Sequence, residues 1–390
     1  MKTGPWRTIA AAGIVAAGFC FVAIVFVASL TEKDASDRDF IEYWAAEHQL
    51  VHGANPYDGS AIFQLERSAG MERDQPEVMF SPPVAFALAL PLGFLGAKTG
   101  LILWLLALLA SLSASLWILW ALQGRPETLL YLLGFVFPPA LMCLKAGQLG
   151  IFLLLGVVLF LYFHKSRPFL AGASLLPCAL KPHLFLPVAI ALILWVASRK
   201  AYRILAGFLA TLGVSCALTL CLDAHVWSEY SQTMRTAGIM DQFVPTLSVV
   251  FRFLLDRNAG WLQFLPSAAA CVWALWYFWT RRKRWSWTDQ GLLLLLVSSV
   301  CTPYAWFTDE SVLLPAVLYG LFKAKESRRS LLPIALITGI ALCEVLKEVQ
   351  ITSPYYLWTT PAWLAWYLYA TWSKDSEAKS IHPEPAIIAN

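Results

Sequence analysis

The sequence predicts an all-α integral membrane protein with about twelve transmembrane helices. Of its 390 residues, 58% are hydrophobic and only 14% are charged, whereas soluble proteins have roughly 45–50% apolar and about 25% charged residues. The apolar residues gather in long runs, and about 20 of them in a helix suffice to cross a hydrocarbon core of about 30 Å. One polar insert, residues 31–83, follows the first run. These observations indicate a single membrane domain over residues 1–390.

The first apolar run covers residues 9–30 and follows Lys2 and Arg7. It is longer than the roughly 7–15 apolar residues of a signal peptide, so we expect it to be retained as the first span. Because Lys and Arg concentrate in cytoplasmic segments, the N-terminus is expected in the cytoplasm and the insert outside.

The insert itself contains a predicted helix at residues 40–51, where apolar and aromatic side chains recur at helical spacing. Gly53 is a natural stop for this helix. An aromatic face of this kind is typical of a helix that lies in the membrane interface. Residues 55–59 have the composition of a turn.

The run that follows, residues 84–95, is short and is broken by proline and glycine, which predicts a re-entrant or interfacial segment. The first outer loop then covers residues 31–98. Further spans are predicted at residues 99–121, 128–144, 148–164, 168–180, 183–198, 203–222, 261–280, 287–301, 311–325, 330–347 and 355–372.

The distribution of charge predicts the orientation of these spans. Most of the 29 Lys and Arg fall in segments that this arrangement places in the cytoplasm. Both termini are then cytoplasmic, including a polar tail at residues 373–390, and residues 223–260 form a second outer loop. The short span at 168–180 is interrupted at Lys181-Pro182, and such breaks at membrane depth occur only where they line protein or a cavity.

Several classes of function lack support in the sequence. There is no H-E-x-x-H, G-x-S-x-G, P-loop or G-x-G-x-x-G motif. No basic face carries interleaved aromatics, which argues against nucleic-acid binding. The eight cysteines form no C-x-x-C pair and are interpreted as small core residues. His48 and His52 could bind a metal but have no obvious third ligand. No cofactor is indicated, and a divalent cation remains open.

Asp39 is the first candidate for chemistry. A carboxylate at the outer membrane face can act as general base for a sugar hydroxyl. The alternative is structural, because Asp39-x-x-Glu42 at a helix start is also a capping arrangement. Asp37 could take either role.

A second set of candidates lies at the outer ends of predicted spans. Ionisable residues beside spans are costly and usually functional, and the positive sign of the charged members of this set suits a phosphate held by charge-assisted hydrogen bonds. The alternative is that its lysines extend to the interface. The set consists of Lys145, Gln148, Lys181, His183 and Arg252.

The third candidate segment is residues 302–310, between two spans on the outer side. Its aromatics are expected at an interface in any membrane protein. Asp309 and Glu310 could bind an acceptor or could simply be solvated.

The order of several short motifs resembles glycosyltransferase family 87, whose members are polyprenyl-phosphate-mannose-dependent transferases of the GT-C superfamily, once known as a domain of unknown function. The resemblance extends over residues 37–320. The motifs are Asp39-Phe40-x-x-Tyr43-Trp44-Ala45-Ala46, Gly53-x-Asn55-Pro56-Tyr57, Phe80-Ser81-Pro82-Pro83, Gly147-Gln148, Leu180-Lys181-Pro182-His183 and Thr302-Pro303-Tyr304-Ala305-Trp306.

The resemblance implies a GT-C-like fold and an inverting transfer at the outer face of the cytoplasmic membrane. The donor would be a polyprenyl-phosphate-linked sugar, expected to be mannose, and the acceptor a glycolipid or glycan. Membrane lipids are the other expected partners. Asp39 matches the first-loop carboxylate and would be the general base. The chain departs from the pattern at Phe307-Thr308-Asp309, where members often carry His. The candidate substrate-binding residues are Tyr43, Asn55, Tyr57, Trp306 and Asp309.

Two other classes of function compete with the transferase. A secondary transporter or a lipid-linked sugar flippase would show paired repeats with broken helices in both halves. The sequence has one clear break and a large outer insert near its N-terminus, which favours the enzyme. A structural protein that binds polyprenyl lipids without chemistry is the third possibility.

Overall fold

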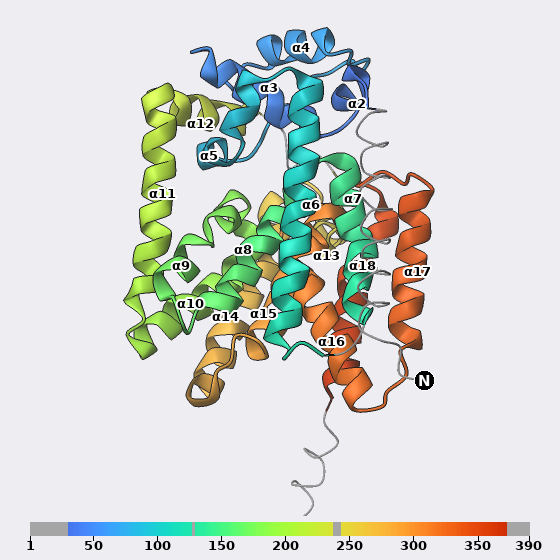
Figure 1. Ribbon diagram of the computed structural model, residues 1–390. Coiled ribbons are helices and arrows are strands. Elements are labelled where there is room, and N and C mark those ends of the chain that lie inside the picture. Colours follow the sequence, from blue (N-terminus) through green and yellow to red (C-terminus); the bar gives the residue numbers. More distant parts are fainter. Residues whose placement is uncertain (1–29, 127–128, 237–242, 373–390) are drawn as a thin grey trace, which may run out of the picture. The chain divides into compact units, whose positions relative to one another are not determined.

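The computed structural model describes residues 30–126, 129–236 and 243–372 (Figure 1). The predicted first span, apart from Leu30, and the predicted tail at residues 373–390 lie outside the described residues. The fold is 75% helical, and no strand occurs in the described ranges, which confirms the all-α prediction.

The chain forms two compact units, and each draws on separate stretches of sequence. Unit 1 comprises Met1–Ala110, Leu144–Gln148 and Leu212–Gly238. Unit 2 comprises Ser111–Cys143, Leu149–Thr211 and Ile239–Asn390. Each unit is described by itself below, and the single domain over residues 1–390 stays a prediction.

Unit 1 is built around a short helix of the polar insert at residues 31–83. Helix α3 packs against α4 and against the 3-10 turn η2 (Leu90–Phe94). The predicted helix at residues 40–51 and its glycine stop are confirmed, with Gly53 at a φ of +71° just beyond the helix. The helices of this unit are α2 (Glu32–Ser36), α3 (Phe40–Val51), α4 (Gly59–Ser68), α5 (Phe86–Ala89), α12 (Val226–Thr236) and parts of α6 (Ala97–Leu122) and α11 (Tyr202–Leu222).

The segment after the insert contains no continuous helix. It divides into η1 (Pro83–Ala85), α5 and η2, each of five residues or fewer. Pro83 begins η1 and Pro91 is the second residue of η2, and proline cannot donate the backbone hydrogen bond that a longer helix would need at those positions. The segment is therefore as short and broken as its sequence predicts, and its location relative to a membrane stays a prediction.

Glu66 of α4 is a buried carboxyl group in the polar insert. Both of its side-chain oxygens lie 3.2 Å from the backbone N–H of Glu77. Burial raises the pKa of Glu66 to about 8, and the N–H contact opposes this shift only in part. The nearby Glu77 forms an exposed ion pair with Arg73.

The raised pKa of Glu66 predicts that the folded insert is more stable at low pH than at high pH. Folding favours the protonated carboxyl, so its contribution to stability is complete below pH 4.5 and is lost as the pH rises through about 8. Limited proteolysis of residues 71–79 should therefore be faster at pH 9 than at pH 6. Glu66→Gln, which cannot ionise, should remove most of this difference, and an equal pH dependence in both proteins would contradict the assignment.

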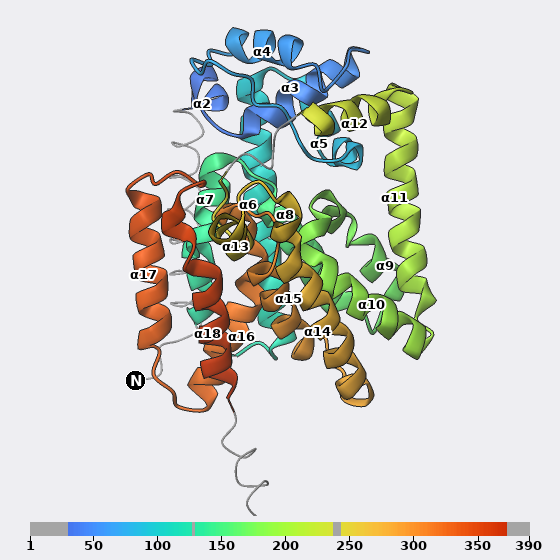
Figure 2. The same cartoon turned by 180° about the vertical axis from the view of Figure 1, so that it is seen from behind.

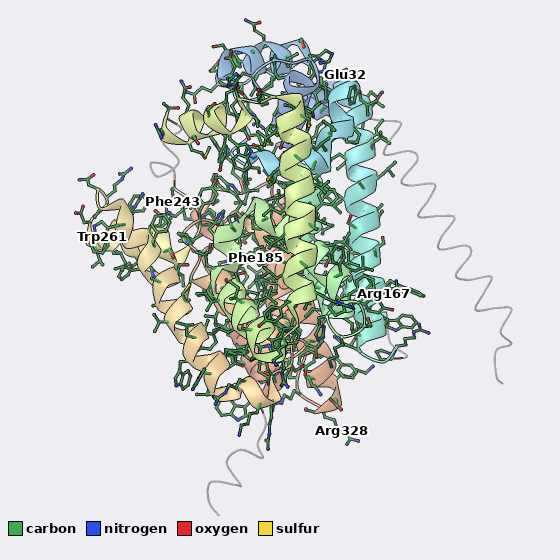
Figure 3. The ribbon with its side chains drawn as sticks, turned by 90° about the vertical axis from the view of Figure 1, so that its left-hand side faces the viewer. Glu32, Arg167, Phe185, Phe243, Trp261 and Arg328 are labelled. Carbon is green, nitrogen blue, oxygen red and sulfur yellow. The ribbon has the colours of Figure 1, made fainter. Side chains whose placement is uncertain are left out.

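Unit 2 is a group of packed helices that includes most of the predicted spans. Helix α16 lies beside α18, α18 beside α17, and α10 beside α14 (Figures 1 and 2). Trp261 of η7 (Gly260–Phe264) is 64% exposed, and Arg328 is in the turn after α16 (Figure 3). The helices are α7 (Pro138–Ala146, in part), α8 (Gly150–Phe163), α9 (Pro168–Ala173), α10 (Leu186–Arg199), α13 (Leu247–Leu255), α14 (Leu265–Arg281), α15 (Gln290–Val300), α16 (Leu314–Glu326), α17 (Leu332–Leu346) and α18 (Thr359–Thr371).

Three helices in the described part of the chain are long and apolar enough to cross a membrane. They are Ala97–Leu122, Pro182–Arg199 and Tyr202–Leu222, which match the predicted spans at 99–121, 183–198 and 203–222. The other predicted spans that the structure describes are shorter or divided helices, so the total of about twelve stays a prediction.

The cysteines are free in the described part of the chain. Cys143 and Cys178 are buried, which agrees with their interpretation as small core residues. Cys221 and Cys343 are exposed, so for these two that interpretation is wrong. Their helices, α11 and α17, carry many exposed apolar side chains, so an apolar run does not ensure burial within the protein.

Candidate active site

Asp39 stands at the N-cap position of α3, but its side chain makes no capping hydrogen bond. Its Oδ2 instead accepts a 2.9 Å hydrogen bond from Nε2 of Gln148. The capping alternative for Asp39 is therefore not the arrangement that the structure shows. The carboxylate is held by a residue 109 positions away in the sequence.

Gln148 connects Asp39 to Tyr43. The Tyr43 hydroxyl donates a 2.8 Å hydrogen bond to Oε1 of Gln148, whose side chain is buried. Since the carboxamide oxygen accepts from Tyr43, its NH2 group faces Asp39. Asp39 and Tyr43 are four residues apart and thus share one face of the helix. The sequence grouped Gln148 with the phosphate-binding cations, whereas the structure places it beside the candidate base.

Gly147 explains how Gln148 reaches this position. Its φ of +74° is a left-handed conformation that suits glycine. A Cβ atom at Gly147 would lie 2.7 Å from Cβ of Phe40, so only glycine permits this close approach. The indole N–H of Trp104 donates a 2.7 Å hydrogen bond to the Gly147 carbonyl, and Arg38 donates to the Lys145 carbonyl. The stretch at residues 145–148 is therefore fixed against α3 and α6.

Gly147→Ala is expected to impair both folding and turnover. Alanine in a left-handed conformation costs roughly 1–2 kcal/mol, and the added methyl would also clash with Phe40. Gly53→Ala is a matched control in the same unit, because Gly53 has a similar φ of +71° and no neighbouring atom within 4 Å. Thermal unfolding and transfer rates of both variants test this, and equal losses would show that the contact with Phe40 is unimportant.

Asn55 and Tyr57 use their polar atoms to shape the insert. The side-chain oxygen of Asn55 accepts a 2.8 Å hydrogen bond from the backbone N–H of Tyr57. The buried Tyr57 hydroxyl donates a 3.1 Å hydrogen bond to the Ser81 carbonyl. The motif at residues 53–57 therefore contacts the motif at residues 80–83 within unit 1. A role of Asn55 or Tyr57 in substrate binding stays a prediction.

Unit 2 contains a second group of candidate residues, which includes an ion pair between Lys181 and Asp309. Lys181 lies between η4 (Leu176–Leu180) and η5 (Pro182–Phe185), where the following proline disfavours helical geometry. Its Nζ is 2.7 Å from Oδ1 of Asp309, and both residues are buried. Oδ2 of Asp309 accepts a 3.0 Å hydrogen bond from the backbone N–H of Trp306. The break in the helix thus directs a lysine inward.

Two of the structural alternatives from the sequence, an interfacial Lys181 and a solvated Asp309–Glu310 pair, are wrong. Lys181 does not extend to an interface, because it is only 8% exposed and is paired. Asp309 and Glu310 are not solvated, because they are 1% and 5% exposed. Asp309 was expected to contact substrate, whereas its two carboxylate oxygens contact Lys181 and Trp306.

Glu310 anchors the segment that carries Asp309, η9 (Phe307–Leu313). Its carboxylate accepts hydrogen bonds from the Thr359 hydroxyl at 2.6 Å and from the Trp363 indole N–H at 2.9 Å. This role could not be predicted from the sequence, because no local signal connects residue 310 with α18.

His183 and the aromatic residues of the 302–310 segment lie together in unit 2. The His183 ring packs edge-on against Tyr304, with ring centroids 5.6 Å apart, and Tyr304 packs edge-on against Trp306 at 5.3 Å. Thr302 donates a 3.3 Å hydrogen bond to the His183 carbonyl. Nε2 of His183 is buried and has no hydrogen-bond partner within the described ranges. It is available to a ligand.

Arg252 and Lys145 differ in their surroundings. Arg252 of α13 is only 3% exposed, and its guanidinium carbon lies 5.0 Å from the ring centroid of Phe253. The Ser248 hydroxyl of the same helix donates a 3.2 Å hydrogen bond to the Cys301 carbonyl, which holds α13 against the end of α15. Lys145 is exposed and belongs to unit 1.

The two units contain groups that suit different chemical steps. Unit 1 offers a positioned carboxylate, suited to accept a proton. Unit 2 offers buried cations and a histidine nitrogen, suited to an anionic group. Among the residues that the structure describes, no group of three or more His, Cys, Asp or Glu side chains could hold a metal ion.

Comparison with known proteins identifies a family. A family model described as glycosyltransferase family 87 matches residues 80–303, more than half of the chain. No curated protein and no solved structure matches the chain significantly. Gly147, Gln148, Lys181, His183 and Arg252 lie within the matched residues, whereas Asp39 and Tyr43 precede them.

Proposed function

Because the chain belongs to glycosyltransferase family 87, we propose that it transfers a sugar, expected to be mannose, from a polyprenyl-phosphate donor to a glycolipid or glycan acceptor. The family makes it a glycosyltransferase with a sugar donor and an acceptor, and its apolar helices make it a membrane protein. The lipid donor, the sugar and the mechanism are the proposal.

The observation that carries the proposal is the arrangement of Asp39. Its carboxylate is committed to a buried glutamine rather than to the end of its own helix. A structural cap would bond the backbone N–H groups of the first turn. A carboxylate positioned by a side-chain amide, which is itself held by a tyrosine, suits the role of a general base.

The proposed reaction is a direct displacement at the anomeric carbon. Asp39 accepts the proton of the acceptor hydroxyl while the hydroxyl oxygen forms a bond to that carbon. The bond between the carbon and the phosphate oxygen breaks, and its electron pair leaves with the lipid phosphate, so the configuration inverts. Because the phosphate already carries negative charge, no second carboxyl group is needed to protonate it, unlike in most glycosidases.

The donor phosphate is proposed to bind the cations of unit 2. Lys181 has three N–H donors and uses one on Asp309. Lys181, Arg252 and the Nε2 atom of His183 could supply charge-assisted or neutral hydrogen bonds to phosphate oxygens. Lys145 and Gln148 belong to unit 1, and Gln148 is proposed to orient Asp39 instead.

We also propose a GT-C-like arrangement of about twelve spans in the cytoplasmic membrane, with both termini inside and the insert outside. Single cysteines in a cysteine-free background test this orientation. Membrane-impermeant reagents added from outside should label sites at Asp58 and Ser228 and should miss sites at Lys283 and Arg328. External labelling at residue 283 would overturn the orientation.

The function is tested by transfer of labelled mannose from polyprenyl-phosphate-mannose in proteoliposomes that contain the purified protein. Labelled product that depends on added acceptor supports the transferase. If the label only exchanges across the membrane and no glycosidic bond forms, the protein is a transporter or flippase instead.

A further inference from the structure

A cavity of about 420 Å³ lies in unit 2 among α8, α10, α11 and α15. This volume is within the range of about 300–1,000 Å³ that is typical of small-molecule sites. None of the candidate active-site residues lines it. Its lining is almost entirely apolar and includes Leu161, Phe185, Leu192, Leu205, Phe208 and Leu295; Phe185 is labelled in Figure 3.

The cavity opens on an apolar surface. Leu186, Ile193 and Leu205 line it and are nevertheless 42%, 63% and 43% exposed. Leu186 and Ile193 belong to α10, and Leu205 belongs to α11. Both helices lie in segments that are long and apolar enough to cross a membrane. A surface of this composition faces lipid chains when the helices span a bilayer, so a hydrocarbon chain can enter the cavity from the bilayer.

One end of the cavity adjoins a group of positive charges. Ala197 and Ile204 both line the cavity, and the turn between them contains Arg199, Lys200 and Arg203, which are all exposed. Residues 182–222 contain no Asp or Glu. Basic pockets between transmembrane helices are typical sites for anionic lipid head groups.

A neighbouring basic stretch joins the same turn. The Arg199 guanidinium donates 3.3 Å hydrogen bonds to the carbonyls of Arg282 and Lys283. This contact keeps Arg199 occupied and brings the 281–284 stretch to the turn. Of the three cations in the turn at residues 199–203, Lys200 and Arg203 remain for a ligand.

Trp287 supplies an independent indication of a polar group in the ligand. It lines the cavity and is only 2% exposed. Its indole N–H has no hydrogen-bond partner in the described part of the chain, although buried donors are almost always paired. The ester carbonyl of a phospholipid is an acceptor of the kind that this donor needs.

We propose that this cavity binds one chain of an anionic membrane phospholipid, with the head group held by Lys200 and Arg203. The chain fills the apolar volume, an ester carbonyl accepts from the Trp287 indole N–H, and the head group lies at the basic turn. This site is separate from the residues proposed for sugar transfer.

The test measures retention of phosphatidylglycerol against phosphatidylcholine with identical chains, by native mass spectrometry of the purified full-length protein. The wild type should retain phosphatidylglycerol preferentially. Lys200→Asn with Arg203→Gln should weaken this retention by about ten- to thirtyfold, because two surface charges are lost. Asparagine is chosen because Lys200 has a φ of 54°, which asparagine tolerates better than most residues.

The matched control removes two positive charges elsewhere. Arg125→Asn with Arg328→Asn changes residues with φ values of 56° and 52° that do not line the cavity, and it should leave retention unchanged. Ala189→Phe, which places a ring in the cavity, should reduce retention of both lipids without changing charge. Thermal unfolding confirms that each variant is folded.

Three outcomes would overturn the proposal. They are equal retention of the two lipids by the wild type, equal effects of the Lys200/Arg203 variant and its control, and a folded Ala189→Phe protein with unchanged retention. Displacement of phosphatidylglycerol by polyprenyl phosphate at equal concentration would assign the cavity to the donor instead, and would also overturn it.

Discussion

Asp39→Asn is expected to yield a folded protein whose turnover is nearly abolished. An asparagine cannot accept the proton of the acceptor hydroxyl, and general base catalysis typically contributes about 10²–10⁴-fold. The substitution preserves size, and the asparagine oxygen can still accept the hydrogen bond from Gln148. Donor binding should persist, so a binding assay with polyprenyl-phosphate-mannose separates loss of chemistry from loss of structure.

The neighbouring acids provide the controls for Asp39→Asn. Asp58 caps α4 by accepting from the backbone N–H groups of Ser60 and Ala61, so Asp58→Asn should keep both the cap and the turnover. Asp37 is exposed, and Asp37→Asn should have only a mild effect. If Asp39→Asn keeps more than a few per cent of the rate, about the least that loss of a general base allows, Asp39 is not the base. Asp37, Asp58 and Asp309 would then be the remaining candidates.

Lys181→Met is expected to destabilise the fold more than any other substitution proposed for this protein. The sequence alone predicted weaker donor binding, by roughly ten- to a hundredfold. The structure adds a second consequence, because the substitution leaves the 1% exposed carboxylate of Asp309 without its cation. Breaking a buried ion pair on one side typically costs about 3–5 kcal/mol. Thermal unfolding in detergent should show a large decrease in the midpoint.

The double variant Lys181→Met with Asp309→Asn separates the two roles of Lys181. Removing both charges relieves the buried carboxylate, and asparagine can still accept from the Trp306 N–H. Stability should therefore recover substantially, while the apparent donor affinity stays low. A double variant that regains wild-type affinity would show that Lys181 serves only to hold Asp309.

The sequence was most informative where a pattern is local. The helix at residues 40–51 and the three long apolar helices follow from spacing and composition, which depend on neighbours in the chain. The predicted span at 128–144 was less accurate. Hydropathy contains no information about the backbone break at Pro138. This residue begins α7 just after η3 (Leu129–Val136) ends, so one apolar run is divided into two helical segments.

The partners of the candidate residues could not be predicted from the sequence. Lys181 meets Asp309 across 128 residues, and Gln148 meets Asp39 across 109. Lys181 and Gln148 are candidate site residues because of their side-chain types and their positions at the ends of predicted spans. Neither property predicts which distant residue they contact. Gln148 was therefore grouped with the cations that share its type of location, although its hydrogen bonds lie with Tyr43 and Asp39.

The contacts of Leu144–Gln148 limit where relatives of this protein can gain or lose residues. Three successive features pin it within unit 1: the carbonyls of Lys145 and Gly147 accept from Arg38 and Trp104, and the Gln148 side chain reaches Asp39. Inserting or deleting one residue would move every later group by one position and separate Gln148 from Asp39. We expect relatives to keep this stretch at constant length, whereas insertions should be tolerated at residues 72–75, which are all exposed.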